Sequence, residues 1–97
     1  MNTVTNNRNS VLQLTVRNHP GVMSHVCGLF ARRAYNLEGI VCLPLGNGET
    51  SRMLLLVNED EKLEQVIQQT RKLVDVIDVS HQDTDKTIFS SLTSAIA

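Results

Sequence analysis

Aromatic side chains are scarce in this chain of 97 residues, and it has no surplus of basic charge. There is no tryptophan, and the aromatic residues are Phe30, Tyr35 and Phe89. The formal net charge is −1, because nine Lys and Arg stand against ten Asp and Glu. Proteins that bind nucleic acids attract phosphates with basic side chains and, for single strands, stack bases on aromatic rings. We therefore expect no nucleic-acid partner.

Long apolar runs are also absent. No run approaches the roughly 18 residues that a membrane-spanning helix requires. The first ten residues, MNTVTNNRNS, are polar and lack the apolar centre of a secretion signal, so residues 1–10 are predicted to be a disordered lead. The two cysteines, Cys27 and Cys42, are then expected to be reduced thiols. These features predict a cytoplasmic protein with no membrane partner.

Groups of side chains that carry out catalysis are not recognisable either. The three histidines, His19, His25 and His81, lack the spacing of zinc ligands. His25 and Cys27 lie two positions apart on a predicted helix and point to nearly opposite sides. There is no glycine-rich phosphate loop and no G-x-S-x-G sequence. We expect a non-catalytic chain that binds no metal and no cofactor of its own.

Two hydrophobic periods alternate along the sequence. A period of two residues predicts strands, and a period near 3.6 predicts helices. Because each helix is long enough to cross back over the sheet, right-handed crossovers put both helices on one face. The order β-α-β-β-α-β predicts an α+β, ferredoxin-like sandwich over residues 11–80, with a four-stranded antiparallel sheet. The predicted strands are 11–17, 37–45, 52–57 and 74–79, and the predicted helices run from Gly21 to Tyr35–Asn36 and from Asn58 to about Leu73.

Asparagine residues are predicted to cap both helices. Asn36 is expected to take the left-handed conformation at the end of the first helix. Asn58 is expected to begin the second helix, with Glu61 completing a capping box three residues later. The predicted buried stripes are Val22, Val26, Leu29 and Phe30 on the first helix and Leu63, Val66, Ile67 and Leu73 on the second.

The sheet face without helices is predicted to be apolar. Leu54 and Leu56 point to it, beside Val41 or Leu43 from the preceding strand. Because one layer of helices covers only one face of a sheet, we expect this surface to bind a partner; edge-of-core packing is the alternative.

The tail, residues 81–97, ends in a short amphipathic pattern. Its apolar residues Ile88, Phe89, Leu92 and Ile96 have helical spacing. A helix this short is not stable alone. The pattern leaves open whether the tail folds against an enzyme partner, folds on the domain's own surface, or frays.

The loop Asn18-His19-Pro20-Gly21-Val22 lies between the first strand and the first helix. Proline suits the first turn of a helix, where its missing N–H is no loss. Gly21 leaves the neighbouring backbone amides uncovered by any Cβ. Amides at a helix N-terminus attract carboxylates, so the loop is a candidate seat for an amino-acid carboxylate. The alternative is a well-formed loop that binds nothing.

Two stretches resemble a known family. LTVRNHPGVMSHVCGLFARRAYNLEGI (residues 14–40) and DEKLEQVIQQTRKLVDVIDV (residues 60–79) are similar to ACT domains, the modules that sense amino acids. More narrowly, they resemble the small regulatory subunits of acetohydroxyacid (acetolactate) synthase. The resemblance covers about residues 11–80, and the shortness of the chain resembles the single-ACT, valine-sensitive bacterial form.

The resemblance implies a homodimer with side-by-side sheets that activates a large catalytic subunit and binds valine between chains for feedback inhibition. FAD, thiamine diphosphate and magnesium are expected in that large subunit. By matching motif, the residues implied in valine binding are Asn18, His19, Pro20, Gly21, Val22, Met23, Asn36, Leu37 and Ile40.

Two other functions known for this fold lack their sequence signatures here. An RNA-binding domain would need exposed aromatics on its central strands, and an acylphosphatase would need an arginine-bearing phosphate loop; neither is present. A free-standing amino-acid-binding ACT module that regulates a different enzyme remains the alternative. The choice among valine, leucine and isoleucine also stays open.

Overall fold

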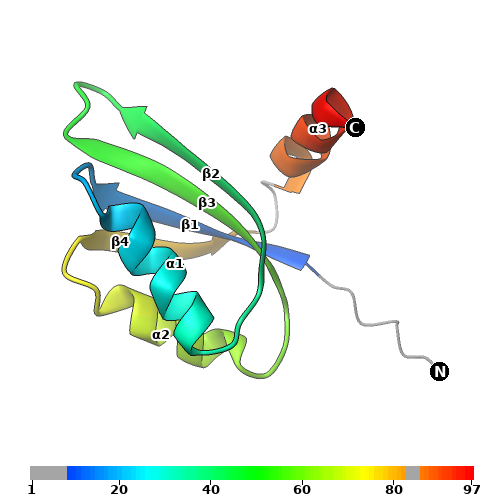
Figure 1. The fold of residues 1–97 in the computed structure, drawn as a ribbon, viewed down its shortest axis with the longest axis horizontal. Coiled ribbons are helices and arrows are strands. Elements are labelled where there is room, and N and C mark those ends of the chain that lie inside the picture. The colour runs from blue at the N-terminus through cyan, green and yellow to red at the C-terminus, as the bar shows by residue number, and fades with distance from the viewer. Residues whose placement is uncertain (1–8, 83–85) are drawn as a thin grey trace.

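The computed structural model describes residues 9–82 and 86–97, and it confirms the βαββαβ order (Figure 1). The four strands form one antiparallel sheet in the order β2-β3-β1-β4, so β2 and β4 are its edges. A third helix follows the last strand. The elements are β1 (Asn9–Arg17), α1 (Val22–Arg32), β2 (Leu37–Leu45), β3 (Thr50–Asn58), α2 (Leu63–Arg71), β4 (Val76–Gln82) and α3 (Lys86–Ile96).

The main core lies between the sheet and the layer formed by α1 and α2. Alternate residues of the two central strands point into it, because successive side chains of a strand face opposite sides. The predicted helix stripes also lie there, except that Leu29 is buried outside this cluster and Leu73 is only half-buried at its margin. The core residues from the strands are Leu12, Leu14 and Val16 of β1, Met53, Leu55 and Val57 of β3, and Val79 of β4.

The end of α1 differs from the prediction. The helix stops at Arg32, and the left-handed residue is Ala34, at φ 55°, rather than Asn36. The Tyr35 amide donates to the Phe30 carbonyl at 2.9 Å, and the Ala34 amide donates to the Ala31 carbonyl at 3.0 Å. The rings of Phe30 and Tyr35 meet edge to face at 6.0 Å. These contacts make a Schellman motif, in which an apolar pair closes the helix end.

Replacing Ala34 with glycine should stabilise the protein. An L-residue in the left-handed region costs roughly 1 kcal/mol, whereas glycine adopts this conformation without strain. We expect Ala34→Gly to raise the free energy of unfolding by about 0.5–1 kcal/mol. Urea titration measures the free energy of unfolding, which Ala31→Gly within the helix should lower. Equal destabilisation by both variants would contradict the proposed strain.

The predicted capping box at the start of α2 is wrong. Asn58 is the last residue of β3, and its carbonyl accepts a hydrogen bond from the Tyr35 hydroxyl. The helix begins at Leu63, and Lys62 at its N-cap makes no side-chain cap bond among the described residues. Asp60 forms the turn instead, since its Oδ1 accepts from the Lys62 amide at 2.7 Å. The hydrogen bond from Tyr35 keeps Asn58 at the end of β3, and α2 therefore begins later in the chain, at Leu63.

Three strands also have different bounds from those predicted. β1 begins at Asn9, so Asn9 and Ser10 belong to the sheet and not to the lead; residues 1–8 lie outside the described part. β3 is longer, and β4 starts two residues late, at Val76. The Val76 amide donates to Leu73 at 3.0 Å, which closes a turn through the predicted strand start. Val74 is therefore 83% exposed.

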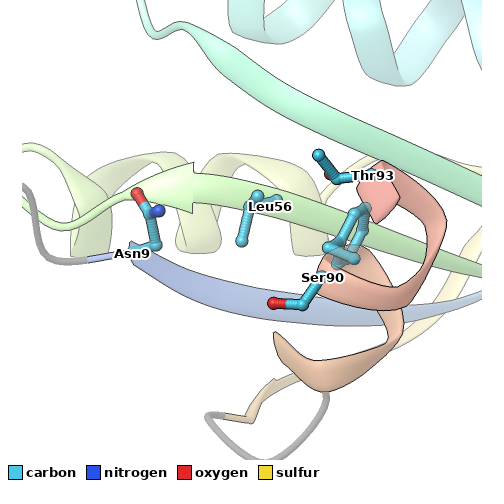
Figure 2. Close-up of a pocket in the computed structure, with 5 residues that line it drawn as sticks. Asn9, Leu56, Ser90 and Thr93 are labelled. Carbon is cyan, nitrogen blue, oxygen red and sulfur yellow. The ribbon is translucent and has the colours of Figure 1, made fainter. Parts of the chain in front are cut away.

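α3 packs on the sheet face opposite α1 and α2. Phe89 is 8% exposed and forms a second apolar cluster with Val11 and Leu54, against which Val41 and Leu56 pack. Figure 2 shows the helix residues Ser90 and Thr93 standing close to Leu56 of β3. The tail thus covers the face that the sequence assigned to a partner, although Leu43 remains 60% exposed.

A glycine in β2 makes room for this packing. A Cβ built on Gly39 would lie 2.9 Å from Cδ1 and Cε1 of the Phe89 ring, closer than real contacts allow. The position of α3 therefore depends on the lack of a side chain at Gly39.

Both cysteines are unpaired thiols and half-buried; Cys42 packs against the main core. Among the described residues, no helix is long and apolar enough to cross a membrane.

Candidate functional site

The loop between β1 and α1 leaves the space over the helix start open, but Pro20 lies before the N-cap and not in the first turn as predicted. Gly21 is the N-cap of α1 at φ 95°, a conformation that L-residues rarely adopt. Nothing lies within 4 Å of where its Cβ would be, so the space over the helix start is open. Within the described chain, the first turn holds no acidic residue and no side chain caps it. The first-turn amides of an α-helix have no partner within the helix and attract anions. Here the Val22 amide donates to the His19 carbonyl at 3.3 Å, so the amides of Met23 and Ser24 are the candidates for an anion within the described chain.

The loop is fastened to the β2–β3 turn by Asn18. Its Nδ2 donates to the Gly48 carbonyl at 2.8 Å, and its backbone amide donates to the Glu49 carbonyl at 3.0 Å. The resemblance implies that Asn18 takes part in valine binding. In the structure its side-chain amide positions the loop, and Asn18 is exposed beside the open helix start.

A second fastening joins the loop to the segment before β4. Nε2 of His19 lies 2.6 Å from Oδ2 of Asp75, and Nδ1 of His25 lies 3.4 Å from the same oxygen. The Asp75 carbonyl accepts from the Arg17 amide at 2.8 Å. Asp75 is 7% exposed, so its carboxylate needs these partners, because burying an unpaired charge is costly.

The ion pair shifts both partners toward their charged forms. The hydrogen bond to Asp75, and next a hydrogen bond to the Pro20 carbonyl, raises the pKa of His19 above 6.5. The hydrogen bond from His19 lowers the pKa of Asp75 below 3.8, against the effect of burial. At pH 6 the pair is therefore an imidazolium and a carboxylate.

The remaining predicted residues lie at the other end of α1. Nδ2 of Asn36 and Nδ2 of Asn58 both donate to Oε2 of Glu38, at 3.3 and 3.2 Å. Leu37 is half-buried against the core, and Ile40 on the edge strand β2 is 37% exposed.

The hydroxyl of Tyr35 fixes the connection that leads into β2, through its bond to the Asn58 carbonyl. Burial, and next the charge of Asp60, raises the pKa of Tyr35 to about 12. The hydroxyl therefore keeps its proton, and this bond, throughout the neutral range.

One chain does not bring the two groups of predicted residues together. Asn18–Met23 precede or begin α1, whereas Asn36, Leu37 and Ile40 follow it (Figure 1). The 11 residues of α1 separate them by about 16 Å, at 1.5 Å per residue. Val22 is buried and Met23 is 40% exposed at the loop end. A site that uses both groups needs a second chain.

Asp75 is the residue of this region that the sequence prediction missed. It stands in the run VDVIDV, where alternation predicts a strand and places Asp75 among its outward-facing polar residues. The signal that could have found it is the predicted antiparallel pairing of β1 with β4. This pairing places the start of β4, and with it Asp75, beside the end of β1 and the histidine-bearing loop.

A further hollow in the described part of the surface is apolar. A groove of about 380 Å³ between α3 and β2 is lined mainly by apolar side chains, including Ile40, Phe89 and Leu92. Across residues 9–82 and 86–97, no three His, Cys, Asp or Glu side chains gather as metal ligands would.

The fold and the loop define an ACT domain. A family model described as the AHAS small subunit-like ACT domain matches residues 12–78. The ACT domain from the GTP pyrophosphokinase of Chlorobium tepidum has the same fold, with a TM-score of 0.59 at 18% identity over 75% of this chain and 95% of that one.

Relatives with higher sequence identity identify the kind of ACT domain. The acetolactate synthase isozyme 1 small subunit of Escherichia coli K12 is 56% identical over 88 residues, which span 91% of this chain and 92% of that protein. The small subunit from Thermotoga maritima has a TM-score of 0.69 at 37% identity, over 76% of this chain and 47% of that one. A probable small subunit of Archaeoglobus fulgidus is 41% identical over 71% of this chain and 44% of its own length. The chain belongs to the family of acetolactate synthase small subunits.

Proposed function

We propose that this chain is the non-catalytic regulatory subunit of an acetolactate synthase in branched-chain amino acid biosynthesis, that it works in the cytoplasm, and that it binds valine as a feedback inhibitor. The observation that carries the proposal is the 56% identity, over nearly the whole of both chains, to a small subunit of that enzyme. The uncapped start of α1, where the Met23 and Ser24 amides follow Gly21, supports a seat for the carboxylate of an amino acid.

The valine site is proposed to form between two copies. β2 is an edge strand and carries the exposed apolar side chains of Ile40 and Leu43. A two-fold axis beside β2 and perpendicular to the sheet would reverse the partner's direction. The Gly21 end of one α1 would then meet the Leu37 end of the other. The carboxylate would bind the amides of one chain, and Leu37 and Ile40 of the partner would contact the branched side chain.

Regulation would work by a shift of population. FAD, thiamine diphosphate and magnesium are proposed to belong to the large catalytic subunit, where catalysis takes place. The dimer would bind that subunit and favour its active arrangement. Valine that binds one arrangement more tightly would draw the assembly toward it. By linkage, the catalytic subunit should in turn change the affinity of this chain for valine.

The test is a titration of valine into the purified full-length chain by calorimetry, with leucine and isoleucine as comparison ligands. We expect one valine to bind at each site between two copies, and sedimentation should show a concentration-dependent dimer. Activity of the large catalytic subunit should rise on addition of this chain and fall when valine is added. Absence of heat at millimolar valine, with no shift of the melting temperature, would contradict valine binding. A pull-down dominated by an enzyme that does not use thiamine would contradict the proposed partner.

A further inference from the structure

The cluster of His19, His25 and Asp75 is not explained by ligand binding alone. Its three side chains come from three parts of the chain: the β1–α1 loop, α1, and the connection before β4. The acid is nearly buried, and its Oδ2 is shared by both histidines at 2.6 and 3.4 Å. The cluster therefore fixes the loop from the side opposite to the Asn18–Gly48 bond.

We propose that Asp75 is a positioning residue for the effector site: through His19 it holds Pro20 and Gly21 in the conformation that opens the first amides of α1, and it makes effector affinity depend on pH. The inference rests on the proposed valine site. Asp75 lies on a different element from the seat, so its effect passes through His19.

The chemistry of the His19 ring gives the pH dependence. Nε2 faces the Asp75 carboxylate at 2.6 Å, and Nδ1 faces the Pro20 carbonyl at 2.5 Å. Both partners are acceptors, so both ring nitrogens must donate, which only the imidazolium can do. A neutral ring has one N–H and keeps one of the two bonds. Loss of the proton therefore releases either the loop carbonyl or the acid.

Two other charged or titratable groups act on the His19–Asp75 pair within the described chain. Arg17 of β1 opposes protonation of His19 by its charge, and His25 of α1 shares the carboxylate. From the β2–β3 turn, Glu49 contacts the loop through its backbone carbonyl. Asp75 is ionised throughout the neutral range, because its pKa is lowered.

The direction of the pH effect on valine affinity follows from the direction in which the pKa of His19 is shifted. The folded-state pKa of His19 is raised, so its two bonds are complete below about pH 6.5, its ordinary value. They are lost as pH rises through the raised pKa. Valine affinity should therefore fall with rising pH, and the loss of positive charge near the seat acts in the same direction.

The experiment is calorimetric titration of valine into the full-length chain between pH 6.0 and 8.5 at constant ionic strength. We expect the affinity of the wild type to fall roughly 3- to 10-fold across this range, the worth of one hydrogen bond. His19→Gln and Asp75→Asn should bind valine more weakly at pH 6.0, with little further change at pH 8.5. Any titration of valine itself appears in all proteins alike and cancels.

The matched control is His81→Gln. His81 makes a similar histidine–carboxylate pair, with its Nε2 3.5 Å from Oε2 of Glu59 and a similar exposure, but in β4 away from the loop. This variant should keep the pH profile of the wild type. A flat profile in the wild type, or an unchanged slope in both His19→Gln and Asp75→Asn, would overturn the inference.

A second measurement separates this inference from the valine site itself. The amide chemical shift of Gly21 should titrate with the His19 ring in the wild type and not in His19→Gln or Asp75→Asn. If no protein binds valine but Gly21 titrates in this manner, the positioning role stands and the proposed function fails. If valine binds and Gly21 does not respond to pH, the positioning role fails.

Discussion

Gly21→Asp should abolish valine binding while leaving the fold intact. A carboxylate at the N-cap of α1 would itself accept hydrogen bonds from the first-turn amides and repel the carboxylate of the ligand. Losing two charge-assisted hydrogen bonds, each worth about 1.5–3 kcal/mol, weakens binding at least about 100-fold. Calorimetry at pH 7 measures the loss, and circular dichroism should be unchanged.

Gly21→Ala is the control for backbone strain. Gly21 sits at φ 95°, so any side chain there strains the backbone by roughly 1–2 kcal/mol. An alanine Cβ meets nothing within 4 Å and leaves the amides uncovered. This variant should be less stable but should bind valine within about threefold of the wild type. Equal loss of binding in both variants would attribute the effect to loop conformation rather than to the anion seat.

Phe89→Ala should release α3 from the sheet. Phe89 is the buried anchor of the second apolar cluster, and an 11-residue helix is not stable without tertiary contacts. Truncating a buried phenylalanine costs about 3 kcal/mol or more, which exceeds what local contacts can restore. We expect amide protons of α3 to exchange at nearly unprotected rates, while those of β1 and β3 stay protected. Hydrogen exchange followed by NMR measures both.

Two further variants sharpen this test. Gly39→Ala leaves Phe89 in place but puts a Cβ 2.9 Å from its ring, so it should also weaken the protection of α3. Ile88→Ala, at a position 40% exposed, should leave α3 protected and serves as the control. Persistent protection of α3 in Phe89→Ala would mean that other contacts hold the helix.

The topology could be predicted because it depends on patterns that are local in sequence. Periods of two and of 3.6 residues marked the first six elements, and the stripes from Val22 to Phe30 and from Leu63 to Ile67 are buried as expected. The open space over Gly21 was expected from its lack of a Cβ, but its positive φ was not predicted.

The errors concern residues whose role is set by distant partners. Asn36 is the better left-handed residue by type, but the contact between Phe30 and Tyr35 places the helix end at Ala34. Asn58 has the sequence of a helix cap, but the Tyr35 hydroxyl engages its carbonyl at the end of β3. Such contacts cross between elements and leave no periodic signal.

The candidate site was predicted in the same uneven way. The open space over the helix start follows from Gly21, which acts locally, whereas Pro20 lies before the N-cap and not in the first turn. The role of Asp75 depends on where the connection before β4 passes the loop, which no spacing reveals. The packing of α3 on the sheet depends on Gly39, about fifty residues before Phe89 in the chain. The amphipathic pattern of the tail therefore could not show whether the tail packs on a partner, packs on the domain itself, or frays.

The placement of α3 restricts how two copies can meet. α1 and α2 cover one side of the sheet and α3 covers part of the other, which obstructs the stacking of two sheets face to face. The outer backbone groups of β2 keep their capacity to pair, since β2 is an edge strand. The proposed dimer would therefore form by lateral extension of the sheet, and the packing of Phe89 on Leu54 leaves that leucine less able to mediate aggregation.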